Sequence, residues 1–189
     1  MIRAAAAAIS ITSLIAVSAL AEPAVKGACP APGTELQTSK GSTLTVIAAN
    51  GLICQLRSSI TGDFALVGLL LRLDTQRQPS KEGVAAIASL WPLAAGKSAQ
   101  YTLTDANGAW IEIYKVGARE KVTTQAGAFD AFPIEQTETP ANGGADAITV
   151  TSLVAPALGY IVRFKVTIPG GAVDRPGSND WELVSVKKP

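Results

Sequence analysis

The chain has 189 residues with 16 basic and 15 acidic side chains, and it contains no histidine. A formal net charge of +1 gives no strong positive field, which argues against nucleic-acid binding because that needs clustered basic charge. The lack of histidine excludes Ser-His-Asp and Cys-His triads and histidine-ligated zinc, and it leaves only catalysis without histidine open. We assign no catalytic residue, no metal site and no cofactor.

Residues 1–21 have the pattern of a secretory signal peptide. Arg3 gives a positive start, residues 4–17 are apolar except for serine and threonine, and Ala19 and Ala21 provide the small-x-small pattern that a signal peptidase cleaves. No lipobox cysteine follows Ala21, so we expect cleavage near Ala21 and a soluble periplasmic or secreted product. No later apolar run reaches the roughly 18 residues that a membrane span needs, so no transmembrane segment is expected after removal of the signal.

Cys29 and Cys54 are the only two cysteines. In an oxidising compartment an even number of cysteines favours pairing, and the sequence has no C-x-x-C motif that would indicate a reactive thiol pair. We therefore expect one structural disulfide between them, which ties a proline-rich N-terminal segment to a β-hairpin that turns at Asn50 and Gly51.

Turn signals recur about every 8–12 residues between β-branched and aromatic runs, which is typical of an all-β protein. Strands are predicted over residues 42–48, 52–57, 64–71, 99–105, 110–123, 129–139, 147–153, 160–168 and 181–187. One helix is predicted over residues 80–90, where apolar residues recur at helical spacing between Ser80 and Pro92. The fold class is therefore mainly β, an antiparallel meander forming a curved sheet or open barrel with one short helix.

One β-rich domain is expected over residues 22–189, because a mature chain of this length suits a single core. Within it, residues 22–75 form the disulfide-stapled hairpin region. Residues 76–98 form the helix and its connector, and residues 99–189 form the antiparallel meander.

The strand predicted over residues 160–168 has the clearest alternation. The residues expected on its core side are apolar: Tyr160, Val162, Phe164, Val166 and Ile168. Those expected on its solvent side are Arg163, Lys165 and Thr167. The sheet should therefore cover a core on one side only. Its concave face needs an apolar partner, which could be the helix, another sheet layer or a bound ligand.

A strand-turn-strand pattern recurs in the later part of the chain. It comprises residues 122–135 (VTTQAGAFDAFPIE), 155–163 (APALGYIVR) and 181–185 (WELVS). Over residues 91–187 this pattern resembles uncharacterised β-rich envelope proteins of Gram-negative bacteria, similar to the DUF3108 group. The group usually has proline before the Ala-Gly turn, where this chain has Gln125. The resemblance implies a β fold and an envelope location, and it carries over no catalytic residue.

Three carboxylates, Glu112, Glu135 and Asp146, lie on or beside neighbouring predicted strands. They could converge as an acid and base pair of the kind that glycoside hydrolases use. The alternative is a solvated sheet face on which these carboxylates meet nearby basic side chains, such as Lys115 and Arg163. We favour this alternative because it is the ordinary arrangement in antiparallel sheets.

Aromatic side chains indicate a different kind of site. Trp110, Tyr114, Tyr160 and Phe164 are candidates to line a ligand cavity, and filling the core is the alternative role for each of them. The sequence thus favours an exported, non-enzymatic β-domain that binds or carries an apolar small molecule. An envelope protein-interaction or inhibitor domain acting through residues 169–180 is the alternative, and a carboxylate-dependent hydrolase is the third candidate.

Overall fold

The computed structural model describes residues 29–73, 80–105, 108–143, 148–167 and 180–189. The expected signal peptide, Asp146, Ile168 and most of the expected interaction loop lie outside the described residues. The elements, in chain order, are β1 (Glu35–Thr38), β2 (Thr43–Asn50), β3 (Ile53–Ser58), β4 (Gly62–Val67), β5 (Leu71–Leu73), α1 (Lys81–Ser89), β6 (Ser98–Asp105), β7 (Gly108–Val116), β8 (Glu120–Thr124), β9 (Gly127–Pro140), β10 (Ile148–Ala155), β11 (Tyr160–Thr167) and β12 (Trp181–Lys187).

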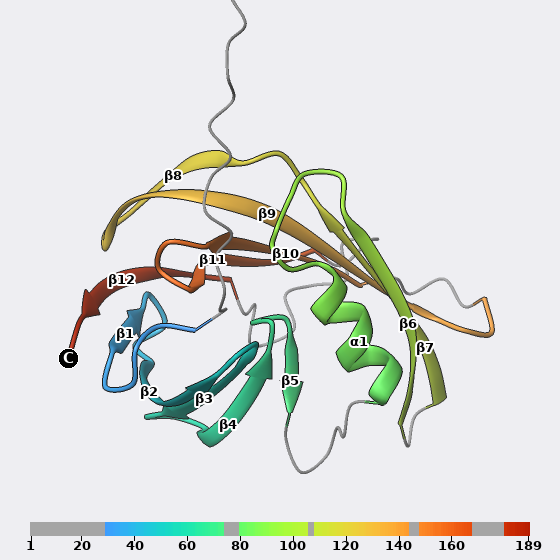
Figure 1. Cartoon of the computed structure of the whole chain (residues 1–189), viewed down its shortest axis with the longest axis horizontal. Coiled ribbons are helices and arrows are strands. Elements are labelled where there is room, and N and C mark those ends of the chain that lie inside the picture. Colours follow the sequence, from blue (N-terminus) through green and yellow to red (C-terminus); the bar gives the residue numbers. More distant parts are fainter. Residues whose placement is uncertain (1–28, 74–79, 106–107, 144–147, 168–179) are drawn as a thin grey trace, which may run out of the picture.

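The described strands form one antiparallel sheet with the order β5-β4-β3-β2-β1-β12-β11-β10-β9-β7-β6, and β8 pairs with β9 beside this path. β5 and β6 stand at the two ends of the order, so the sheet curves round without closing into a barrel (Figure 1). The predicted fold class, a mainly β protein with a curved antiparallel sheet and one short helix, is confirmed.

The hydrophobic core fills the space inside the curved sheet. Strands β2 to β5 form one wall, β6 to β11 form the other, and α1 lies between β5 and β6 on the open side (Figure 1). Leu56 on β3, Ile134 on β9 and Ile87 on α1 are buried members of the same cluster. The core therefore depends on elements from both halves of the chain.

Helix α1 is held at both of its ends. The Oγ of Ser80 accepts a hydrogen bond of 3.1 Å from the backbone N–H of Gly83, which is a standard N-cap. The ammonium of Lys97 donates to the carbonyl oxygens of Ser89, Leu90 and Pro92, at 3.3, 3.4 and 2.8 Å. These bonds satisfy carbonyls that a helix end leaves unpaired, and they tie the end of α1 to the start of β6.

Two glycines let α1 approach the sheet closely on both sides. A Cβ atom added to Gly83 would lie 3.0 Å from the ring of Tyr101 on β6. A Cβ atom added to Gly68, in the turn between β4 and β5, would lie 2.6 Å from the side chain of Ile87 on α1. The helix therefore fits between the two end strands with no room for further side-chain atoms at these points.

Two of the predicted strands are wrong because each is divided in the structure. The strand predicted over residues 64–71 breaks after Val67, where Gly68 and Leu69 have φ values of 55° and 67° and make a tight turn. The strand predicted over residues 110–123 ends at Val116. Gly117 then packs against Pro133 and donates its N–H to the carbonyl of Pro133 at 2.8 Å before β8 begins.

A disulfide joins Cys29 to Cys54 on β3. Cys54 is fully buried, and the Cα atoms of the two residues are 5.3 Å apart. On its other side Cys29 meets the turn between β10 and β11, where a Cβ atom added to Gly159 would lie 2.8 Å from the carbonyl carbon of Cys29. The start of the described chain is therefore fixed between β3 and the turn from β10 to β11.

The strict alternation predicted for residues 160–168 holds only after the first part of β11. Tyr160, Ile161 and Val162 are all buried. The register between β10 and β11 shifts at this point, and Val162 is the extra residue of a β-bulge. Beyond the bulge, Phe164 is half-buried and Lys165 is exposed, as the alternation predicts. Because an extra residue reverses the alternation, Ile161 reaches the same cavity as Phe164.

Candidate functional site

A pocket of about 430 Å³ opens into the concave side of the sheet. Its walls come from β2 to β5 on one side and from β9 to β12 on the other. Its apolar lining includes Leu44, Leu66, Leu69, Ile161, Phe164 and Trp181. Pockets that bind small molecules usually enclose roughly 300–1,000 Å³ and are mostly apolar, so this pocket has the size and the surface of such a site.

Phe164 and Trp181 form a stacked aromatic pair on one wall of the pocket. Their backbones pair across β11 and β12, and their rings are stacked with centroids 5.8 Å apart and planes inclined by 10°. Both side chains are only half-buried, although they pack against the core. The stack therefore keeps apolar ring surface available to a molecule in the pocket.

Two hairpin turns line the mouth of the pocket. Lys40 and Ser42 belong to the turn between β1 and β2, and Ile60 and Thr61 belong to the turn between β3 and β4. Lys40, Ile60 and Thr61 are exposed, and Ile60 keeps 66% of its surface in contact with solvent. The two turns lie side by side, with the Oγ atoms of Ser42 and Ser58 3.2 Å apart, and the pocket meets the solvent beside them.

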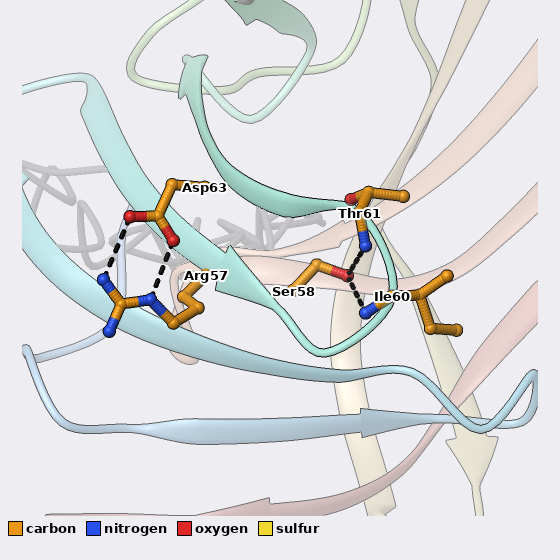
Figure 2. Close-up of polar contacts among 5 residues, drawn as sticks. All are labelled: Arg57, Ser58, Ile60, Thr61 and Asp63. Atoms are coloured by element: carbon orange, nitrogen blue, oxygen red, sulfur yellow. Dashed lines mark hydrogen bonds and ion pairs between the residues drawn. The ribbon is translucent and has the colours of Figure 1, made fainter.

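The turn that carries Ile60 is fixed by side-chain hydrogen bonds, which Figure 2 shows. The Oγ of Ser58 accepts hydrogen bonds from the backbone N–H groups of Ile60 and Thr61, both at 3.1 Å. Arg57 donates to Asp63 through Nε and Nη2, at 2.8 and 3.0 Å. This paired hydrogen bond holds the pKa of Asp63 below its usual value. The backbone on both sides of Ile60 is thus held in place.

A smaller pocket of about 100 Å³ adjoins the larger one, and Arg72 and Gln136 line both. The smaller pocket contains the carboxylate of Glu112, which is 1% exposed. The side-chain amide of Gln136 donates to Oε2 of Glu112 at 2.7 Å. The guanidinium of Arg72 lies 4.4 Å from the centre of the Phe64 ring, and it brings a positive charge to the pocket that holds Glu112.

Two buried tyrosines remain protonated under ordinary conditions. Burial raises the pKa of Tyr114 well above its usual value, and the negative charge of Glu112 raises it further. Burial alone raises the pKa of Tyr160. Tyr114 also stacks on Tyr101 across β6 and β7, with ring centroids 6.2 Å apart. These hydroxyls therefore act as neutral groups in the walls of the two pockets.

The aromatic residues that the sequence suggested for a ligand cavity do not share one cavity. Tyr160 and Phe164 line the larger pocket, and Tyr114 lines the smaller one. Trp110 lines neither, and its indole N–H is buried without a hydrogen-bond partner among the described residues. The sequence reasoning missed the mouth. The exposed isoleucine within the polar run from Ser58 to Gly62 is the signal that could have indicated it.

The two described carboxylates of the suggested acid and base pair lie on opposite faces of the sheet. Glu112 is buried on the concave face. Glu135 is exposed, and its backbone pairs with that of Lys115, which is also exposed. Because side chains alternate along β9, Gln136 reaches Glu112 while its neighbour Glu135 points outward. These two carboxylates therefore do not form a catalytic pair.

In the described part of the chain, no group of three or more metal-ligating side chains could hold a metal ion. None of the described helices is both long enough and apolar enough to pass through a membrane.

Comparison with known proteins finds similarity to two solved structures. No protein-family model and no curated protein matches the chain. A candidate exported protein with a YmcC-like fold from Bacteroides fragilis is 13% identical, with a TM-score of 0.41, over 85% of this chain and 98% of that one. A candidate lipoprotein from Parabacteroides distasonis is also 13% identical, with a TM-score of 0.44, over 85% of this chain and 98% of that one. The resemblance of residues 91–187 to the DUF3108 group is not supported by a family match.

Proposed function

We propose that the mature protein is an exported, non-enzymatic binding or carrier domain that holds an apolar small molecule in the larger pocket. The observation that carries this proposal is the apolar pocket of about 430 Å³ between the two walls of the sheet, with the half-buried stack of Phe164 and Trp181 on one wall. An apolar ligand that covers this ring surface would gain about 25 cal/mol for each Å² removed from water.

The geometry also supports binding rather than hydrolysis. Glu112 is covered by the protein and hydrogen-bonded to Gln136, and Glu135 faces the opposite side of the sheet. A hydrolase of the type considered would need two carboxylates about 5–9 Å apart around the bond to be broken. The described lining of the larger pocket is mostly apolar and contains no carboxylate, which suits reversible binding.

Quenching of tryptophan fluorescence tests this proposal directly. Trp181 lines the larger pocket, whereas Trp110 lines neither of the two pockets described here. A long-chain alcohol brominated in its chain should therefore bind the delipidated protein and quench Trp181 by contact. The quenching should disappear in Trp181→Phe and remain in Trp110→Phe. Absence of binding to the folded wild-type protein would overturn the proposed function.

Chain length provides a second readout of the same binding. Each methylene group removed from the alcohol should weaken its affinity about fourfold, because burial of one methylene contributes roughly 0.8 kcal/mol. The dependence should hold for chains that fit inside the pocket. An affinity that does not change with chain length would contradict an apolar pocket as the binding site.

A further inference from the structure

The charges that line the larger pocket all have one sign. Among the described residues that line it, the ionisable side chains with charge at neutral pH are Lys40 and Arg72, and both are basic. No aspartate or glutamate occurs in this described lining. A low-polarity cavity with cationic groups attracts a negatively charged ligand and disfavours a positively charged one.

Lys40 lies where a polar head group would meet the solvent. It is exposed in the turn between β1 and β2, at the mouth of the pocket and beside the turn that carries Ile60. A molecule with its chain against Phe164 and Trp181 would place its polar end toward these turns. Lys40 can therefore contact the head group without removing its own ammonium from water.

The hydrogen bonds of the mouth leave Ser42 as a donor. The Oγ atoms of Ser42 and Ser58 are 3.2 Å apart. Ser58 Oγ already accepts two backbone N–H groups, from Ile60 and Thr61, and these occupy both of its lone pairs. Ser58 must then donate its own proton to Ser42, which leaves the hydroxyl proton of Ser42 able to donate to a ligand. The mouth thus offers an O–H donor and an ammonium together.

Arg72 brings a second positive charge to the lining, and its side chain on β5 is exposed. Its guanidinium lies over the ring of Phe64 and also lines the smaller pocket that contains Glu112. Its charge is therefore shared between the buried carboxylate and the larger pocket. For this reason Lys40, at the mouth, is the residue expected to decide which head groups are preferred.

We infer that the ligand is an anionic amphiphile, with its hydrocarbon chain in the larger pocket and a carboxylate or phosphate head group held at the mouth by Lys40 and Ser42. This inference rests on the proposed function, since it names the chemical class of the molecule that the same pocket binds. A head group with negative oxygen atoms fits both donors, and the described lining contains no carboxylate to repel it.

The test compares three probes with the same chain length on the delipidated protein: a long-chain carboxylate, an alcohol and a trimethylammonium salt. The carboxylate should bind about tenfold more tightly than the alcohol at low salt, because a charge-assisted contact is added. The trimethylammonium salt should bind more weakly than the alcohol. High salt should reduce the advantage of the carboxylate, because the mouth is exposed to solvent.

Matched variants locate the effect. Lys40→Gln should bring the ratio of carboxylate to alcohol affinity toward one, and Lys40→Glu should shift the preference toward the cationic probe. Lys115→Gln removes the same charge from the exposed face of β7, where Lys115 lines neither pocket, and should leave the ratio unchanged. Equal affinities for carboxylate and alcohol in the wild type would overturn the inference and leave the proposed function standing. A carboxylate advantage that persists in full in Lys40→Gln would also overturn it. Failure of all three probes to bind would overturn the proposed function itself.

Discussion

Phe164 and Lys165 are neighbours on β11, yet Phe164 lines the pocket and Lys165 is exposed on the outer face. Phe164→Ala should cost about 2 kcal/mol, less than the roughly 3–5 kcal/mol of a fully packed phenylalanine, because the ring is half-buried. It should also weaken the binding of an apolar ligand. Lys165→Ala should change stability by less than about 0.5 kcal/mol.

Denaturant melts of the two variants measure these changes in the free energy of unfolding. Equal losses at the two positions would show that the assignment of β11 to an inner and an outer face is wrong. A full loss of about 4 kcal/mol at Phe164 without any change in ligand affinity would mean that the ring belongs to the closed core.

Glu112 and Glu135 provide a comparison between a buried and an exposed carboxylate. Glu112→Ala should destabilise the protein by about 3 kcal/mol, because it leaves the amide of Gln136 and the charge of Arg72 without the buried carboxylate beside them. Glu112→Gln, which keeps an acceptor oxygen, should cost less. Glu135→Ala, on the exposed face, should stay within about 0.5 kcal/mol, and denaturant melts compare the three.

The disulfide should stabilise the fold by constraining the unfolded chain. With a sequence separation of 25 between Cys29 and Cys54, its reduction should lower the free energy of unfolding by about 3.5 kcal/mol. Calorimetry with and without reductant measures the loss. In the native, non-reduced protein an alkylating reagent should label neither cysteine, and stoichiometric labelling would contradict a complete disulfide.

Alanine substitutions at Gly159 and Gly143 distinguish the cost of backbone strain from the cost of a steric clash. Both have a positive φ, of 72° and 82°, but only Gly159 faces another segment, the backbone of Cys29 at 2.8 Å. Gly143→Ala should cost about 1 kcal/mol from its left-handed conformation, and Gly159→Ala should cost about 3 kcal/mol because the added Cβ also displaces Cys29. Similar losses at both sites, measured by thermal melts, would refute the close packing of the turn on Cys29.

We expect the protein to lose stability at alkaline pH, because two tyrosines are buried. Tyr114 and Tyr160 have raised pKa values in the folded state, so each binds its proton more tightly there than in the unfolded chain. Their contribution is fully present below the unfolded pKa of about 10 and declines above it by about 1.4 kcal/mol per pH unit for each tyrosine. Urea melts at about pH 8 and about pH 11 should show this loss, and Tyr160→Phe should make it smaller. A stability that is constant over this interval would contradict the burial of both hydroxyls.

The sequence was sufficient for features that depend on neighbouring residues. The helix after Ser80 and the hairpin at Asn50 and Gly51 follow from capping and turn chemistry, which act over a few residues. The open, curved sheet followed from the succession of strands and turns. Val162 illustrates the limit, because a bulge depends on the pairing of two strands and leaves no mark in the alternation of one strand.

The site was less accessible to sequence reasoning because its parts come from distant segments. The backbone N–H of Glu182 donates to the Oγ of Ser39 at 3.1 Å, which joins the last strand to the turn of Lys40. This contact follows from the pairing of β1 with β12, and the sequence reasoning did not recognise β1 as a strand. Without that pairing, nothing indicated that Lys40, Ile60 and Trp181 would line the same pocket.

In a closed β-barrel the number of strands and their stagger determine the diameter. Here the gap between the end strands β5 and β6 is filled by α1. The distance between these strands therefore depends on how closely the helix packs against Tyr101 at Gly83 and against the turn at Gly68, as well as on the strand pairings. A displacement of α1 would change the separation of the two end strands at the expense of side-chain contacts, with every described strand pairing intact.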